Sequence, residues 1–183
     1  MPDLSWQRIA RRVRVPLGFL FAGAFIWLAR PTIRSIGAGS SLVLFGLLIR
    51  ALASGHVKKN ELLTVTGPYA YTRNPLYLGS FVLAAGFAIA ARSWWVALIA
   101  TVFLFTIYFP VIRAEEEFLR VRFPEFEGYA GNVPRLFPRS TAYKSSSSSF
   151  SWHLYWKHRE YNAAIGSVVM IVALVMKVIW LAP

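Results

Sequence analysis

The stretch that decides the fold is residues 75–112, which read PLYLGSFVLAAGFAIAARSWWVALIATVFLFTIYFPVI and contain a single charged side chain, Arg92. A membrane-spanning helix needs about 20 mainly apolar residues. We therefore expect two spans here, over residues 75–91 and 94–112, that form a hairpin. Such a hairpin brings the polar segments before residue 75 and after residue 112 to the same membrane face.

Three further apolar segments qualify as spans, over residues 13–29, 33–53 and 163–182. The chain is 56% hydrophobic, whereas soluble domains are near 45–50%. We read the first segment as a retained span and not a signal peptide, because no small-residue cleavage site follows it. The sequence predicts an all-α integral membrane protein with about five transmembrane helices and catalytic loops at the cytoplasmic face.

The net charge of +12, from 20 Lys and Arg against 8 Asp and Glu, points to an anionic partner. In so apolar a chain the anionic membrane surface is the simplest partner, and nucleic acid is not needed. The chain has no cysteine, which excludes disulfides, thiolate catalysis and zinc–thiolate sites. We expect no metal site.

The basic residues also predict the orientation. With a cytoplasmic N-terminus, 16 of the 20 basic residues fall inside, as the positive-inside rule requires. The four on the other side are Arg30, Arg34, Arg92 and Lys177. We therefore expect a multi-pass inner-membrane protein whose N-terminus and active site are cytoplasmic.

The polar segment of residues 67–79 reads GPYAYTRNPLYLG and has the composition of a functional site. We call this segment the motif loop. Gly67-Pro68 marks a turn, and Asn74-Pro75 is typical of a helix start with Asn as the N-cap. The helix N-terminus and the neighbouring Arg73 form a seat for a carboxylate or phosphate.

A second cluster, Glu115-Glu116-Glu117, follows the fourth span in a chain with few acidic residues. If the helix continues, Glu116 can pair with Arg120. Carboxylates at a membrane boundary could bind a cationic cofactor group or take up a proton. A solvated helix end with ordinary salt bridges explains the same spacing equally well.

The order of these motifs resembles the isoprenylcysteine carboxyl methyltransferase and phospholipid methyltransferase superfamily. The resemblance covers residues 55–138 and includes a third motif, Val-Pro-Arg-Leu-Phe-Pro at 133–138. It implies a helical membrane fold, S-adenosylmethionine as methyl donor, and a site at the cytoplasmic face that is open to lipid.

The resemblance also implies site residues. The family's Arg-His-Pro-x-Tyr-x-Gly matches Arg73, Asn74, Pro75, Tyr77 and Gly79, and its paired glutamates match Glu115 and Glu116. The expected catalytic residues are Arg73, Glu115 and Glu116. The expected cofactor-binding residues are His56, Tyr69, Arg73, Asn74, Pro75, Tyr77, Gly79 and Glu116. Asn74 replaces the family histidine and cannot titrate near neutral pH. Phe126 and Tyr129 are the nearest matches to the family's later aromatic residues.

The methyl acceptor stays open. A lipid-like substrate of the isoprenylcysteine carboxylate type needs no base, whereas a phospholipid amine, small amine or thiol must lose a proton. A membrane reductase that uses NADPH shares a similar Arg-His-Pro segment, and a non-enzymatic scaffold is the remaining alternative.

We divide the chain into three parts: an N-terminal two-helix hairpin over 1–54, a methyltransferase core over 55–138, and a C-terminal part over 139–183. The last part contains a serine-rich linker, an aromatic and basic segment that is either an interfacial helix or a loop, and the final span. Arg50, near the end of the second span, is expected to extend to the membrane surface.

Overall fold

The computed structural model describes residues 20–58, 62–143 and 149–181, whose regular structure is entirely helical. A helical segment over residues 20–28 precedes α2 (Ile33–Ser54), η1 (Gly67–Ala70), α3 (Pro75–Ala91) and α4 (Trp94–Phe103). The π-helical η2 (Leu104–Tyr108), α5 (Phe109–Arg122), α6 (Phe126–Asn132), α7 (Trp152–Lys157) and α8 (Tyr161–Leu181) follow. Helices α4, η2 and α5 run on as one helix of 29 residues.

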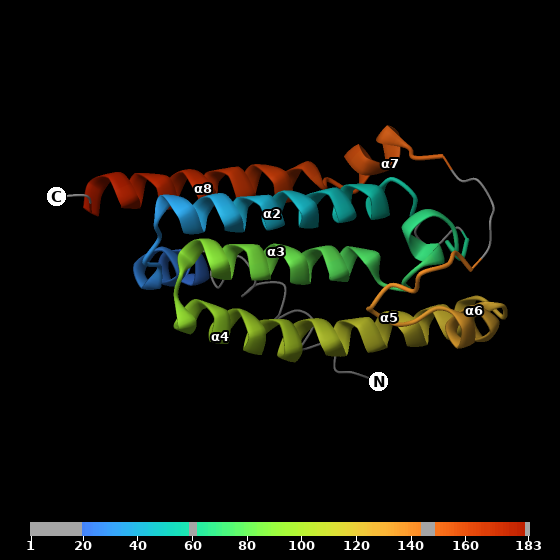
Figure 1. The fold of residues 1–183 in the computed structure, drawn as a ribbon. Coiled ribbons are helices and arrows are strands. Elements are labelled where there is room, and N and C mark those ends of the chain that lie inside the picture. The colour runs from blue at the N-terminus through green and yellow to red at the C-terminus, as the bar shows by residue number, and fades with distance from the viewer. Residues whose placement is uncertain (1–19, 59–61, 144–148, 182–183) are drawn as a thin grey trace.

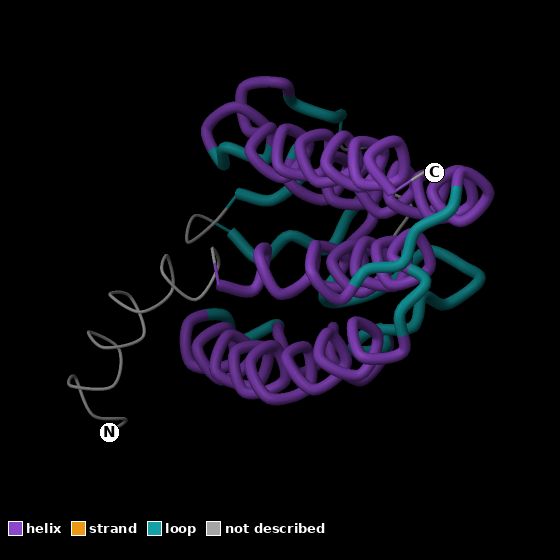
Figure 2. Tube along the Cα trace, turned by 90° about the vertical axis from the view of Figure 1, so that its left-hand side faces the viewer, coloured by secondary structure: helices purple, strands orange, loops and turns teal. Residues whose placement is uncertain are grey.

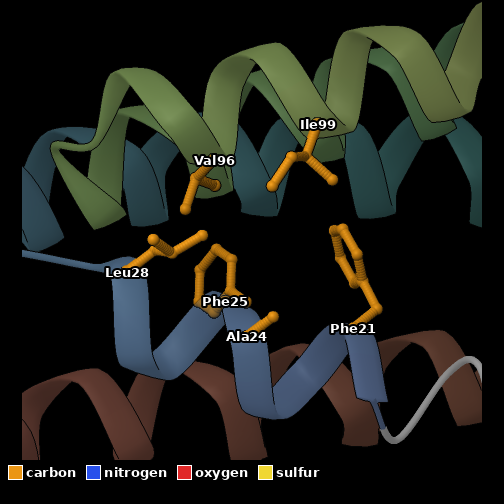
Figure 3. A pocket seen from close by; sticks show the side chains of 6 residues that line it. All are labelled: Phe21, Ala24, Phe25, Leu28, Val96 and Ile99. Carbon is orange, nitrogen blue, oxygen red and sulfur yellow. The ribbon is translucent and has the colours of Figure 1, made fainter.

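The long helices lie side by side, in the order α8, α2, α3 and α4–α5 (Figure 1). We call the end with α6, α7 and the motif loop the motif end. The far end holds the start of α2, the start of α4 and the C-terminus of α8, and Figure 2 looks onto it. The segment 20–28 packs against α4 there, with Phe25 and Leu28 pointing toward Val96 (Figure 3).

Glycines allow α2 and α3 to touch backbone to backbone. A Cβ atom on Gly39 would lie 2.5 Å from the carbonyl oxygen of Gly86, and one on Gly46 would lie 2.8 Å from that of Gly79. Small residues at these positions are the usual means of close packing between apolar helices. The hairpin start at Pro75 is thereby fixed relative to α2.

Within the part of the chain that the structure describes, three helices are long and apolar enough to cross a membrane: Ile33–Ser54, Trp94–Arg122 and Tyr161–Trp180. The expected spans 33–53 and 163–182 match two of them, and α3 coincides with the expected span 75–91 but has only 17 residues. The expected first span falls partly outside the described residues. The all-α fold with candidate membrane-spanning helices is therefore confirmed for the described residues, whereas the number of spans and the sidedness of the loops stay predictions.

The structure decides two points that the sequence left open. The helix that contains the fourth apolar segment does not end at residue 112 but continues to Arg122, and it carries Glu115–Glu117 out of the apolar region. In the aromatic and basic segment, residues 152–157 form the short helix α7 with Trp152 and Trp156 exposed, as an interfacial helix requires. Most of the serine-rich linker lies outside the described residues.

Candidate active site

The motif loop folds as the turn and helix-start signals predict. Gly67 adopts a φ of +57°, which favours glycine, and Pro68 opens the short helix η1. Asn74 occupies the N-cap position of α3 and Pro75 the first helical position. These residues place Arg73 and Asn74 at the motif end, beside the end of α5.

The centre of the site is the carboxylate of Glu116, which is only 4% exposed. It accepts hydrogen bonds from Arg135 Nε at 3.0 Å and Nη2 at 2.8 Å, and from Asn74 Nδ2 at 3.3 Å. Arg73 Nε lies 3.6 Å from Glu116 Oε1. A buried carboxylate is costly unless it is paired and hydrogen-bonded, and this one is held by residues of the two other sequence motifs.

Asn74 does not cap α3 with its side chain, which corrects the expected capping role. Its amide nitrogen donates instead to Glu116 and, at 2.9 Å, to the carbonyl oxygen of Arg135. The physical reason is that the buried carboxylate of Glu116 needs hydrogen-bond donors, and the Asn74 amide supplies one. Asn74 thus replaces a titratable histidine by a neutral donor that faces the glutamate.

The segment 133–143 is the element that closes the site. It runs alongside the motif loop through backbone bonds from Arg73 to Pro134, from Arg139 to Tyr71 and from Tyr143 to Ala70, each 3.0 Å long. Thr72 Oγ1 adds a bond of 2.9 Å to the carbonyl oxygen of Leu136. The third motif therefore delivers Arg135 to Glu116, a role that sequence reasoning did not assign.

Glu116 and Arg120 do not pair, contrary to the expectation from their spacing. Arg120 turns outward and binds Glu117 at 2.8 Å and also Glu127. The reason is rotation of α5, which directs Glu116 inward toward the motif loop and leaves Glu117 exposed. Of the paired glutamates, Glu116 is buried and joins the motif loop to the third motif. Glu115 is exposed and interacts with the hydroxyl of Tyr77.

Buried aromatic residues stabilise the motif loop. The Tyr129 hydroxyl donates to the carbonyl oxygen of Tyr69 at 2.7 Å, and Phe126, Tyr129 and Val133 form a small core. Burial raises the pKa of the Tyr69 hydroxyl well above its usual range, and Tyr129, Glu115 and Glu160 raise it further. Tyr69 is therefore a neutral donor at physiological pH and not a base.

Arg50, which was expected to extend to the membrane surface, is held in an ion pair with Glu160. Its guanidinium group binds Glu160 at 2.8–3.0 Å and donates to Ser80 Oγ at 2.5 Å. Apolar surroundings make pairing cheaper than exposing one charge to lipid. An isolated arginine near the end of the apolar helix α2 and a glutamate directly before the apolar helix α8 were the signal that could have predicted this pair.

The remaining predicted residues lie around this centre. The ring of His56 contacts Gly67 and Phe150 and its Nδ1 lies 2.7 Å from the carbonyl oxygen of Leu52, so it supports the beginning of the motif loop. Gly79 faces α2, where a Cβ atom would lie 2.6 Å from Arg50 Cγ. Their roles in cofactor binding stay predictions. Within the described ranges no group of three His, Cys, Asp or Glu could hold a metal ion.

Comparison with known proteins points to one family. The model of the phospholipid methyltransferase family matches residues 13–125. This range contains the motif loop and the paired glutamates but ends before Arg135 and Glu160.

Three curated relatives are similar over part of their length. The nickel-cobalt-cadmium resistance protein of Alcaligenes xylosoxydans xylosoxydans is 37% identical over 60% of this chain and 51% of its own. The cobalt-zinc-cadmium resistance protein of Cupriavidus metallidurans is 36% identical over 64% of this chain and 55% of its own. Protein-S-isoprenylcysteine O-methyltransferase of Schizosaccharomyces pombe is 28% identical over 67% of this chain and 48% of its own. The chain spans about half the length of these relatives, and no solved structure matches it.

Proposed function

Because this chain belongs to the phospholipid methyltransferase family, we propose that it is a membrane methyltransferase that transfers a methyl group from S-adenosylmethionine to a lipid-like acceptor. The observation that carries the proposal is the buried Glu116, on which Arg73, Asn74 and Arg135 converge from separate parts of the chain. A purely structural scaffold gives no reason to bury so polar a cluster at the edge of a membrane.

The cluster suits an anionic group of the cofactor. Arg73 and Arg135 carry two positive charges against the single negative charge of Glu116, and the buried Arg73 Nε has no hydrogen-bond partner among the described residues. A guanidinium group is a preferred partner for a carboxylate such as that of S-adenosylmethionine. Arg73 would bind that carboxylate, with the N-terminus of α3 adding its partial positive charge.

The remaining polar residues would orient the reactants. When bound, S-adenosylmethionine supplies an activated methyl group on a positively charged sulfur. Glu115 would face the cationic part of the donor or the acceptor, because it is exposed and directed toward Tyr77. Alignment of this kind, with water excluded, can contribute roughly 7–11 kcal/mol to the lowering of the barrier.

The first choice of acceptor is a carboxylate of the isoprenylcysteine type. Such an acceptor needs no base, and neither Asn74 nor the neutral Tyr69 could serve as one. The similarity to the S. pombe isoprenylcysteine methyltransferase supports this choice. A phospholipid amine, small amine or thiol would need Glu115 as the base. For the orientation, we propose that the motif end faces the cytoplasm, on the distribution of basic residues.

The test is calorimetric binding of S-adenosylhomocysteine to the full chain in detergent, with NADPH measured in parallel. We expect S-adenosylhomocysteine to bind, and Glu116→Gln to abolish the binding. Glu117→Gln is the matched control, because that neighbouring glutamate is exposed and points away from the site. Asn74→Ala, which removes one donor but no charge, provides a milder variant should Glu116→Gln not fold.

Binding of NADPH and not S-adenosylhomocysteine would overturn the proposal in favour of a reductase. If wild type and a folded Glu116→Gln variant bind S-adenosylhomocysteine equally, the methyltransferase proposal stands. The Glu116 cluster is then not part of the cofactor site.

A further inference from the structure

The far end of the bundle contains an open hollow of about 560 Å³, remote from the motif loop. It is lined by residues at the end of the segment 20–28, at the start of α2 and near the end of α8. These elements meet at the far end of the bundle (Figure 1). Its polar lining includes Arg30, Thr32, Arg92 and Lys177, and Trp27 stands at its side. The hollow is large enough for a phosphate group with its substituents.

Positive charge in this hollow is not neutralised by the described part of the chain. The six described acidic residues lie on or next to α5, α6 and the start of α8, which are at the motif end (Figure 1). They are Glu115, Glu116, Glu117, Glu125, Glu127 and Glu160. Lys177 Nζ is held by the carbonyl oxygens of Ile26 at 2.5 Å and Ala29 at 2.7 Å. Arg30 and Arg92 are exposed and lack an acidic partner among residues 20–58, 62–143 and 149–181.

The backbone holds the two arginines next to each other. Arg30 N donates to the carbonyl oxygen of Ala91 at 2.7 Å, so Arg30 is fixed beside the residue that precedes Arg92. Arg92 itself ends α3 with a φ of 48°, and its N–H bonds back to Ala88 and Ile89. Thr32, beside Arg30, is locked by reciprocal bonds with Ser35 at the start of α2. Such preorganisation lowers the entropy that a bound anion must overcome.

Exposed tryptophans indicate the level of the membrane at which the hollow lies. Trp27, Trp94 and Trp180 are 81%, 88% and 82% exposed, and each lies at the far end of its helix. Tryptophan is enriched where the acyl chains meet the headgroups. The arginines therefore lie at the level where lipid phosphates are found.

We propose that this hollow binds the phosphate of an anionic phospholipid from the adjoining leaflet, with the Arg30 and Arg92 guanidinium groups as its ligands. Paired guanidinium groups match the oxygens of a phosphate, and each basic residue near a charged bilayer surface strengthens binding about fivefold. The site is independent of the methyl-transfer site, because none of its residues belongs to the motif loop or to α5.

The experiment measures binding of phosphatidylglycerol to the full chain in detergent by native mass spectrometry, with phosphatidylcholine and inorganic phosphate as the other ligands. We expect the double variant Arg30→Gln/Arg92→Gln to bind phosphatidylglycerol about 25-fold more weakly than wild type. Arg34→Gln, an exposed arginine on α2 outside the hollow, is the matched control and should bind like wild type.

Two outcomes would overturn the proposal: unchanged phosphatidylglycerol binding in the double variant, or displacement of the lipid by inorganic phosphate at equal concentration. Should the double variant not fold, Arg30→Lys/Arg92→Lys and a salt titration of wild type replace it. Retention of binding in the lysine variant together with loss at high salt supports the site, and salt-independent binding by wild type contradicts it.

Discussion

Arginine side chains pair with glutamates at one end of the bundle and have no described carboxylate partner at the other. At the motif end, Arg50, Arg73 and Arg135 are directed to Glu160 and Glu116 across helices and loops. At the far end, Arg30 and Arg92 are exposed with no described carboxylate to pair with. The difference teaches that the paired arginines at the motif end organise the fold, whereas Arg30 and Arg92 at the far end are available to the surroundings.

Among the substitutions that test this comparison, Glu116→Ala has the largest expected effect. The variant leaves two arginines without a counter-charge, and we expect it to lower the free energy of unfolding by about 3 kcal/mol. This is the low end for a buried pair, because the Arg135 side chain is 40% exposed. Chemical unfolding in detergent would measure the loss. Glu117→Ala is the control, with an expected change below about 1 kcal/mol. Similar losses for the two variants would mean that the cluster does not stabilise the motif end.

Glycine substitutions test whether the two ends share one scaffold. Gly39→Ala near the far end and Gly46→Ala nearer the motif end should each lower the unfolding free energy by about 1–3 kcal/mol, because their Cβ atoms would meet the backbone of α3. Gly37→Ala is the control, because nothing lies within 4 Å of its added Cβ. Thermal unfolding of the three variants would show the difference, and a stable Gly39→Ala protein would contradict the close packing.

A change in pH should affect the motif end in particular. Burial raises the pKa of Tyr69, so its neutral form stabilises the folded state below the ordinary tyrosine pKa, and this contribution is lost as the pH rises beyond it. We expect Tyr69 to contribute about 1.4 kcal/mol per pH unit to the fall in unfolding stability above pH ~10, and Tyr69→Phe to reduce the slope by that amount. Urea titrations at several alkaline pH values would measure it. Tyr71→Phe, at an exposed position of the same loop, is the control and should retain the slope.

The smallest expected effect is on the stability of the far end. In detergent without lipid, Arg30→Gln should change the free energy of unfolding by no more than about 0.5 kcal/mol, as for other exposed side chains without a partner. Methyl transfer should also stay at the wild-type rate. Thermal unfolding and a turnover assay would check both values. A large loss would show that Arg30 organises the fold after all and would remove the contrast between the ends.

Much of the fold follows from local sequence. The bounds of α3 are those predicted from the apolar run and from Asn74-Pro75, and α2 differs from the expected span by one residue. The order of the three motifs also identified the family that the comparison confirms. Local signals suffice here because hydrophobic runs, prolines and caps act over a few residues.

The partners of the charged residues could not be predicted in the same way. The spacing of Glu116 and Arg120 suggested a pair that does not form, because rotation of α5 about its axis decides which glutamate points inward. Nor did the sequence predict that Arg50 binds Glu160, which is 110 residues away in the chain. Sequence spacing carries no information about contacts at such separations.

The sequence by itself determined the helices, the apolar surface and the set of polar residues at each end, because these depend on composition and local order. Tertiary structure decided that Asn74 serves Glu116 instead of capping α3, that Arg135 closes the site, and that Arg30 lies beside Arg92. Each of these contacts joins segments distant in the chain, and packing of α2 on α3 and of the segment 133–143 on the motif loop brings those segments together.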